Sequence, residues 1–199
     1  IVKSNDAPGE LCTCTSDVLD LEDQLNLISA IQPDVKKIGI IYTSSEDNSV
    51  SNLARLREIC AARNITVVAK AVQNASDIPS VANDVASQVD CINNFTDNNV
   101  VNNLSVVLAA AETYGIPVYG SEVEQVKNGC LASVSIEYVA LGKETGRMGI
   151  DILKGADASK MAVRTISDAT PVFNETVGNA LNISVPDGYS TIEIVKTAD

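Results

Sequence analysis

Short apolar runs recur along the middle of the chain, each bounded by polar or turn-forming residues. Runs of this length and composition are typical of strands that are buried on both faces of a parallel sheet. The pattern predicts strands over Lys37–Thr43, Thr66–Val72, Asp90–Phe95, Pro117–Gly120 and Leu131–Ile136.

Amphipathic helical patterns fill the gaps between these strands. The first is expected to start at Ser49, the second near Asp77, and the third to run from about Asn98 to Gly115, its C-cap. The residues expected on their inward faces are Val50, Leu53, Leu56 and Cys60, then Val81, Val85 and Val89, then Val101, Leu104, Leu108 and Ala111. Strands joined by helices need right-handed crossovers, so the fold class predicted is α/β, with a doubly wound parallel sheet between two helical layers.

The two ends of the chain fit this alternation less well. Asp20–Ile31 and Tyr138–Lys154 are predicted helices, the second with Leu141, Thr145, Met148 and Ile152 along one stripe. Beyond Gly155 the pattern predicts edge strands at Ala162–Ile166 and Val172–Phe173, followed by a helix at Val177–Asn182.

Composition supports the α/β class and removes several functions. Hydrophobic residues make up 45% of the chain but aromatic ones only 4%, as expected where aliphatic strands form the core. A net charge of −12 argues against a nucleic-acid partner, which needs a basic face. The chain has no histidine, which excludes Ser-His-Asp and Cys-His catalysis and any histidine-ligated metal. We therefore expect no enzyme.

The five cysteines are interpreted as structural thiols. Cys60 and Cys91 fall on apolar faces, where a thiol packs as a small hydrophobic group. Cys12 and Cys14 are too close in sequence for an easy disulfide and lack the second pair that a zinc site needs. No phosphate-binding glycine loop and no metal-ligand spacing is present, so we expect neither cofactor nor metal.

Three loops are the candidate binding elements, because ligands of open parallel sheets bind beyond the carboxyl ends of the strands. They are Thr43–Ser49, Phe95–Asn99 and Gly120–Glu124, all rich in hydroxyls, amides and carboxylates. Helix N-termini favour a carboxylate and acidic side chains an ammonium, so the loops together suit a small zwitterionic ligand. The alternative is that these residues only cap helices.

Four segments resemble the tryptophan-binding-protein-like family of ABC transporter substrate-binding proteins. They are KKIGIIYTSSEDNSV (36–50), FTDNNVV (95–101), PVYGSEVEQVKNGCLASVSIEY (117–138) and LGKETGRMGIDILKG (141–155). The resemblance implies a periplasmic-binding-protein-like fold of two lobes, of which this chain lacks most of the first. Residues 1–19 would form the end of the first lobe, and residues 20–132 would form the second lobe. Residues 133–199 would run back to the first lobe in a crossover helix, and their C-terminal tail would complete both lobes.

The resemblance also implies a binding site between the lobes. It places Ser44, Ser45, Asn48 and Ser49 at the charged end of the ligand; Thr96, Asp97 and Asn98 on the opposite wall; Glu122 in the third loop; and Ser16 and Asp17 on the hinge side. Cys14 and Glu10-Leu11 in the first segment depart from the family's pattern. The ligand implied is an amino acid, with aromatic ones as the candidates, and the partner is an ABC permease.

The resemblance implies an extracytoplasmic protein, periplasmic or anchored as a lipoprotein. The alternative is a cytoplasmic ligand-sensing core of the same fold, repressor-like, whose DNA-binding segment is absent from this chain; the upstream coding sequence would discriminate the two. Because the chain begins at Ile1 with no start methionine, we expect a piece of a longer protein. Such a piece should bind more weakly than micromolar, and its exposed cleft face would favour a homodimer or a swapped assembly.

Overall fold

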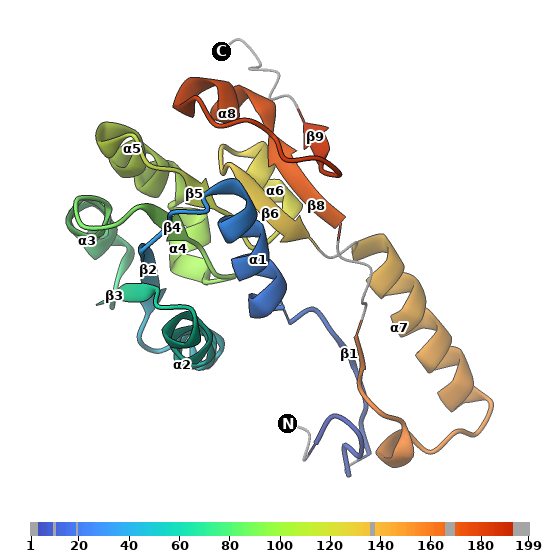
Figure 1. The fold of residues 1–199 in the computed structure, drawn as a ribbon. Helices are drawn as coiled ribbons and strands as arrows, with labels where there is room; N and C mark the ends of the chain where they lie inside the picture. Colours follow the sequence, from blue (N-terminus) through green and yellow to red (C-terminus); the bar gives the residue numbers. More distant parts are fainter. Residues whose placement is uncertain (1–3, 10, 19, 136–137, 166–169, 193–199) are drawn as a thin grey trace, which may run out of the picture. The chain divides into compact units, whose positions relative to one another are not determined.

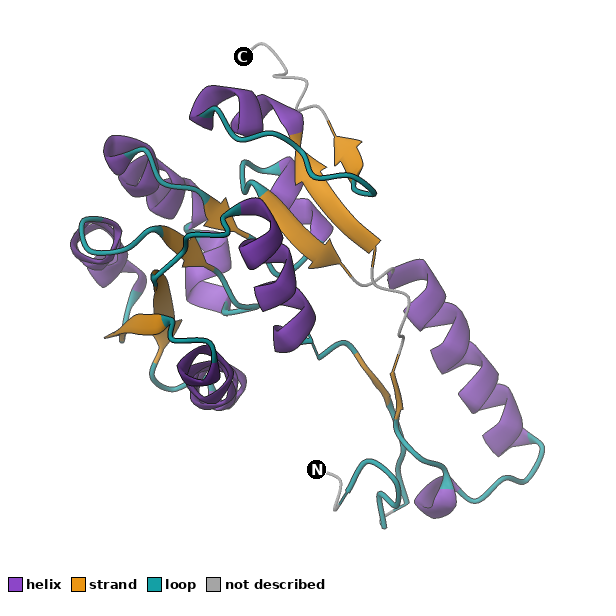
Figure 2. Ribbon diagram, in the orientation of Figure 1, coloured by secondary structure: helices purple, strands orange, loops and turns teal. Residues whose placement is uncertain are grey.

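The computed structural model of the protein describes residues 4–9, 11–18, 20–135, 138–165 and 170–192. The strands are β1 (Thr15–Ser16), β2 (Lys37–Thr43), β3 (Thr66–Val72), β4 (Cys91–Asn93), β5 (Val118–Tyr119), β6 (Ala132–Ser135), β7 (Arg164–Thr165), β8 (Thr170–Asn174) and β9 (Ser190–Ile192). The helices are α1 (Leu21–Ile31), α2 (Asp47–Ala62), α3 (Ile78–Ala86), α4 (Asn98–Asn102), α5 (Leu104–Tyr114), α6 (Val123–Lys127), α7 (Tyr138–Leu153) and α8 (Glu175–Leu181). Figures 1 and 2 show these elements along the chain.

The chain separates into two compact units. Unit 1 comprises residues 1–19 and 136–170, and unit 2 comprises residues 20–135 and 171–199. The unit boundaries fall after residues 19 and 135, near the lobe boundaries expected after residues 19 and 132. The assignment of these parts to the lobes of a larger protein stays a prediction.

Unit 2 is built on a parallel sheet. Its described strands form a seven-stranded sheet in the order β3-β2-β4-β5-β6-β8-β9. β2 and β3 pair in parallel over their whole length, from Lys37 opposite Thr66 to Thr43 opposite Val72. The neighbours β2–β4, β4–β5 and β5–β6 are also parallel. The predicted doubly wound α/β fold is therefore confirmed.

Helices cover both faces of this sheet. α3 and α5 lie side by side (Figure 1) and share a buried apolar cluster with the strands. Val118 of β5 belongs to that cluster, whereas the next residue, Tyr119, donates its hydroxyl to Gln32 beside α1. Because successive side chains of a strand point to opposite faces, α1 and its neighbour α2 cover the other face.

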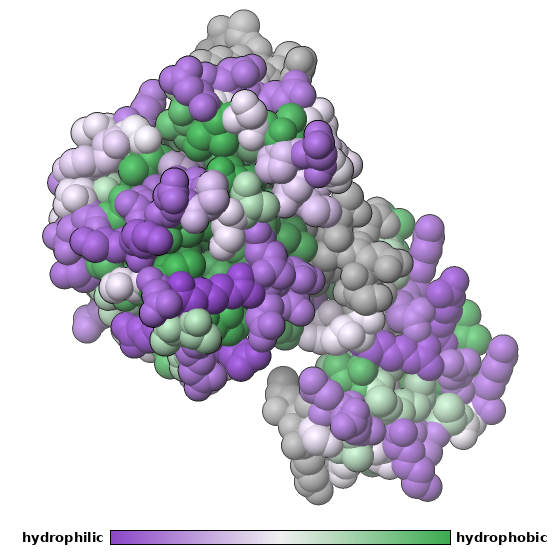
Figure 3. Space-filling model, viewed as in Figure 1, coloured by the Kyte–Doolittle hydropathy of each residue, from purple (hydrophilic) through white to green (hydrophobic). Residues whose placement is uncertain are grey.

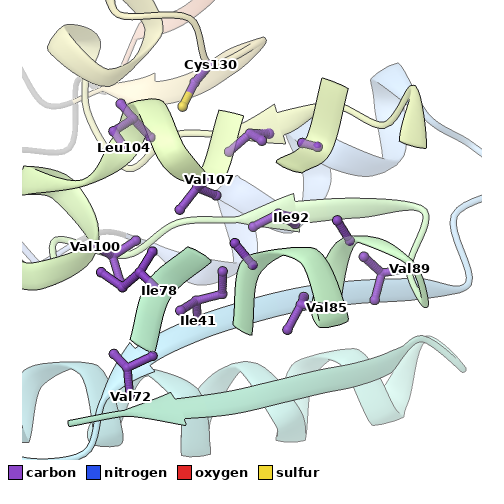
Figure 4. Close-up of a cluster of buried hydrophobic side chains, with 14 of the residues drawn as sticks. Ile41, Val72, Ile78, Val85, Val89, Ile92, Val100, Leu104, Val107 and Cys130 are labelled. Carbon is purple, nitrogen blue, oxygen red and sulfur yellow. The ribbon is translucent and has the colours of Figure 1, made fainter. Parts of the chain in front are cut away.

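The main apolar cluster joins the sheet to α3, α4 and α5. Figure 4 shows Ile41 of β2, Ile78 and Val85 of α3, Ile92 of β4 and Val107 of α5 converging in it. Gly39 of β2 lets α3 approach closely, because a Cβ there would lie 2.5 Å from Val85 Cγ1. Hydrophilic residues make up most of the coloured surface on the face seen in Figure 3.

Unit 1 is smaller, and its described residues include the helix α7, a 3-10 turn at Ala158–Lys160 and a two-stranded parallel sheet. Thr15 of β1 pairs with Arg164 of β7, and the hydroxyls of Thr15 and Thr145 lie 2.6 Å apart. Arg164 bonds Glu144 of α7, and Arg147 lies 3.1 Å from the same carboxylate. The hydrogen bonds from Arg164 and Arg147 lower the pKa of Glu144 below its ordinary value. The pair of Arg164 and Glu144 thus ties β7 to α7, whereas Arg147 pairs with Glu144 within the helix.

The C-terminal strands differ from the prediction. Val172 and Phe173 were expected on an edge strand, but β8 lies between β6 and β9 and both side chains are buried. The error follows from β9, which was not predicted because Ser190–Ile192 carries no apolar run. β7 covers Arg164–Thr165 of the predicted strand Ala162–Ile166, and Ile166 lies outside the described residues. α8 begins at Glu175, two residues before the predicted start.

The third predicted helix is two helices. α4 ends at Asn102 and α5 begins at Leu104, and Asn103 between them has a non-helical conformation (φ −119°, ψ 26°). The Asn103 side chain donates to the carbonyl of Asn99 (2.8 Å), a local bond that competes with regular helix hydrogen bonding. Apolar periodicity continues across this break, so the sequence pattern did not indicate it.

The start of α2 was also predicted too late. The helix begins at Asp47, so Ser49 is inside it and not before it. This changes the inward face: Ser49 and Ile59 are buried, whereas Val50 is 43% exposed. In α7, Met148 is buried as predicted but Ile152 is 40% exposed. β4 is shorter than expected and covers only Cys91–Asn93.

Candidate ligand-binding site

The loop after β2 presents both exposed and buried hydroxyls. Ser44 and Ser45 are exposed, whereas Thr43 and Ser49 are buried. Asn48 is exposed, and its side-chain amide donates to the carbonyl of Thr96 in the next loop (3.1 Å). Ser44 and Ser45 are therefore the hydroxyls of this loop that a ligand can reach.

Asp97 connects three segments at the carboxyl end of the sheet. Its carboxylate is fully buried and accepts from the Thr43 amide (2.7 Å), the Thr43 hydroxyl (2.7 Å) and the Ser49 hydroxyl (2.7 Å). It also accepts from the Val100 amide (3.2 Å) and so caps α4. The four bonds use most of the acceptor capacity of the two oxygens, so Asp97 positions the loops.

Glu46 is a residue of this site that was not selected from the sequence. Its carboxylate accepts from the main-chain amide of Asn98 (3.1 and 3.2 Å) and from the Asn98 side chain (3.1 Å). Glu46 precedes α2, a position where an acidic residue usually signals a cap, yet its side chain makes no cap bond there. It links the β2 loop to the β4 loop instead.

Glu122 lies in the third loop and caps α6. Its carboxylate accepts from the amides of Glu124 (2.8 Å) and Gln125 (2.9 Å). The side chain is half-buried, and beyond these two bonds each oxygen keeps a lone pair for a ligand. Gln125, one turn further on, donates to the hydroxyl of Ser121 (2.7 Å).

A pocket of about 220 Å³ lies where the β4 and β5 loops meet. It is lined by Thr96, Asp97, Asn98, Val101, Asn102, Glu122 and Gln125. Four of the predicted site residues thus surround one space, while the β2 loop is bonded to its edge. Val101, Asn102 and Gln125 were not selected, although they follow the predicted loop residues at about one helical turn.

The start of α2 offers the free amide groups of the site. Within the described part of the chain, no group accepts from the amides of Asp47, Asn48 and Ser49, and the first intrahelical bond runs from Val50 to Glu46 (3.1 Å). Four unpaired amides are normal at the start of a helix, where they favour an anion. In the short helices α4 and α6, by contrast, amides of the first turn donate to the carboxylates of Asp97, Glu46 and Glu122.

Ser16 and Asp17 belong to unit 1. Ser16 is in β1, its hydroxyl accepts from the Val18 amide (3.3 Å), and Asp17 is exposed. Their role on the hinge side of the site stays a prediction.

The described thiols are free and those in unit 2 are buried. Burial raises the pKa of Cys60 to about 11, against the opposing effect of Arg63, and raises the pKa values of Cys91 and Cys130 as well. Among the residues that the structure describes, no group of three or more acidic or thiol side chains is placed to hold a metal ion. The same residues contain no helix with the length and apolarity needed to cross a membrane.

A polar pocket at the carboxyl ends of a parallel sheet defines the class as a ligand-binding α/β unit. The sequence model of one family, the ABC transporter substrate binding proteins, matches residues 1–194. The chain belongs to this family. Its fold is periplasmic-binding-protein-like, as the comparisons with solved structures also show.

Three relatives illustrate the similarity. The tyrosine-binding protein of Clostridioides difficile (strain R20291) is 31% identical over 183 residues, which are 92% of this chain and 53% of that protein. A structure from Streptococcus pneumonia, an ABC domain in complex with L-Trp, is 32% identical with a TM-score of 0.87, covering 96% of this chain and 68% of that one. A ligand-free, open substrate-binding protein from Clostridium difficile is 30% identical with a TM-score of 0.81, covering 96% and 66%.

The chain spans about half the length of the curated relatives it matches. A ribose operon repressor from Lactobacillus acidophilus is 11% identical with a TM-score of 0.61, covering 83% of this chain and 64% of that one. That likeness concerns the fold alone.

Proposed function

We propose that this chain is part of the solute-binding component of an ABC import system and that it holds an amino acid at the loops after β2, β4 and β5. The observation that carries the proposal is the start of α2. Two unpaired amides of exposed residues there, of Asp47 and Asn48, follow the exposed hydroxyls of Ser44 and Ser45 in the same loop. The 16-residue helix adds a positive dipole end, so the group suits the ligand's carboxylate.

The ligand's ammonium group requires an acceptor on the same edge. Glu122 supplies it, since its half-buried carboxylate lines the pocket and keeps acceptor capacity beyond its two cap bonds. Thr96 and Asn98 are exposed on the pocket wall and add further polar contacts. Asp97 acts indirectly by holding Thr43, Ser49 and α4 in place.

The identity of the ligand class is supported by the relatives. One is named a tyrosine-binding protein and another was solved with L-Trp, at 31% and 32% identity. We therefore propose an aromatic amino acid, bound outside the cytoplasm and delivered to a membrane permease. Binding by dipoles and hydrogen bonds needs no reactive nucleophile, which agrees with a protein that catalyses nothing.

A thermal-shift screen of the chain tests the proposal. L-tryptophan, L-tyrosine and L-phenylalanine are compared with ribose, because a similar fold occurs in a ribose operon repressor. A bound ligand at about tenfold its dissociation constant stabilises the fold by about 1.4 kcal/mol, a rise of a few degrees. We expect this rise with an amino acid and none with ribose.

A variant pair tests the carboxylate site. The double substitution Ser44→Ala and Ser45→Ala should weaken amino-acid binding by about tenfold, since it removes two hydroxyl donors. Ser51→Ala, at an exposed position further along α2, is the control and should bind like the parent. Calorimetry that gives equal affinities for both variants would place the carboxylate elsewhere.

A further inference from the structure

Gln125 is the buried polar side chain of the pocket that lacks part of its hydrogen bonding. The residue is only 1% exposed, and its Nε2 donates to the Ser121 hydroxyl (2.7 Å). Its Oε1 has no partner among the described residues. A buried carbonyl oxygen without a donor is costly, so a donor supplied by a ligand would be favourable.

Gln125 also stands where two adjoining pockets meet. The second pocket, of about 270 Å³, shares Val101, Asn102, Glu122 and Gln125 with the first. Together they run from the carboxyl-end loops along α4 towards the start of α5. Partly buried Val101 and buried Gln125 thus line both pockets.

Further buried polar side chains lie close to Gln125, beneath the residues that line the pockets. The paired residues Asn93 and Tyr119, and Tyr119 and Ala132, place Asn94, Gly120 and Ser133 next to one another on neighbouring strands. Both amide atoms of Asn94 and the Ser133 hydroxyl are buried without partners among the described residues.

Gly120 fixes the place of the Gln125 side chain. A Cβ on Gly120 would lie 2.9 Å from Gln125 Cβ and 3.5 Å from its Oε1. The amide thus lies directly over the end of β5, held by the bond to Ser121. Because Nε2 is the atom that donates to the Ser121 hydroxyl, Oε1 keeps its acceptor capacity for a donor on a ligand.

We propose that Gln125 is a specificity-determining residue that accepts a hydrogen bond from a donor at the end of the ligand's aromatic side chain. The inference rests on the proposed amino-acid binding. It predicts that the site prefers a phenol O–H or an indole N–H to an unsubstituted ring. A site built for a donor rejects the analogue that lacks it, because the buried acceptor is then left unpaired.

The test compares L-tyrosine and L-phenylalanine, which differ by one hydroxyl. Dissociation constants come from amide chemical-shift titrations of the chain, which also measure weak binding. The parent should bind tyrosine about five- to tenfold more tightly than phenylalanine. In Gln125→Met, of similar volume, the two affinities should agree within about twofold. Gln88→Met, at an exposed position outside the pockets, is the control and should keep the preference.

The outcomes separate this inference from the proposed function. Equal affinities of the parent for the two amino acids, or a preference that survives in a folded Gln125→Met, would overturn the role of Gln125 and leave amino-acid binding standing. If Gln125→Met does not fold, the ratio of the dissociation constants of the parent for tyrosine and phenylalanine is the remaining test of this inference. Binding of neither amino acid, nor of L-tryptophan, would remove the proposed function and this inference with it.

Discussion

Asp97 shows how one side chain can hold together the loops at the carboxyl end of the sheet. Its buried carboxylate joins β2 through Thr43, α2 through Ser49 and α4 through Val100. A carboxylate can satisfy these donors because it is only an acceptor, whereas an amide would turn two hydrogens towards them. The sequence placed Asp97 in the ligand wall; the geometry makes it the group that positions that wall.

Replacing this carboxylate should therefore affect folding. Asp97→Asn is expected to lower the free energy of unfolding by about 2 kcal/mol or more, because charged hydrogen bonds are lost and buried donors stay unpaired. Urea unfolding followed by circular dichroism measures the change. Asp34→Asn, exposed in the turn before β2, is the control and should remain within about 0.5 kcal/mol of the parent. An equally small change in Asp97→Asn would contradict the positioning role.

At the scale of elements, apolar pattern was a good guide to the central strands and a poor one to boundaries. β2 and β3 match their predicted limits because their runs are long and flanked by clear turns. The break at Asn103 and the strand β9 were missed, since one depends on a side-chain bond and the other on pairing with β8. Neither the break nor the strand depends on the apolar periodicity of the sequence.

The site shows the same limit. The carboxyl-end rule selected three loops as candidates, but it did not predict which of their side chains would hydrogen-bond to one another. Glu46 and Asn98, or Asp97 and Ser49, are separated by about fifty residues in the sequence, and only the fold brings them together. The pocket residue Gln125 was missed because it lies behind the loop, on the helix.

The packing of α3 on β2 gives a prediction for this scale. Gly39→Ala should destabilise the protein by about 1–3 kcal/mol, because its Cβ would lie 2.5 Å from Val85 Cγ1 and 3.1 Å from Val89 Cγ2. Gly149→Ala in α7 has open space and should instead stabilise by up to about 1 kcal/mol through helix propensity. Urea unfolding of the two variants should show opposite signs. A neutral Gly39→Ala would mean that α3 can shift without cost.

At the scale of the whole molecule, the chain is a member of a substrate-binding family that spans about half of its curated relatives. Unit 2 carries the three loops and the pocket, whereas Ser16 and Asp17 belong to unit 1. In the predicted two-lobed site, a ligand would also contact the first lobe, most of which this chain is expected to lack. We therefore expect a ligand that contacts only the loops of unit 2 to bind weakly. The expected homodimer or swapped assembly stays a prediction.

The central claim is that an aromatic amino acid binds at the carboxyl ends of β2, β4 and β5. It is tested most directly by titrating L-tryptophan into the isotope-labelled chain and mapping the amide shifts. We expect saturable shifts at Ser44–Ser49, Thr96–Asn98 and Ser121–Gln125, with the largest at the amides of Asp47 and Asn48. Shifts confined to other parts of the chain, or no saturable shift with any aromatic amino acid, would contradict the account.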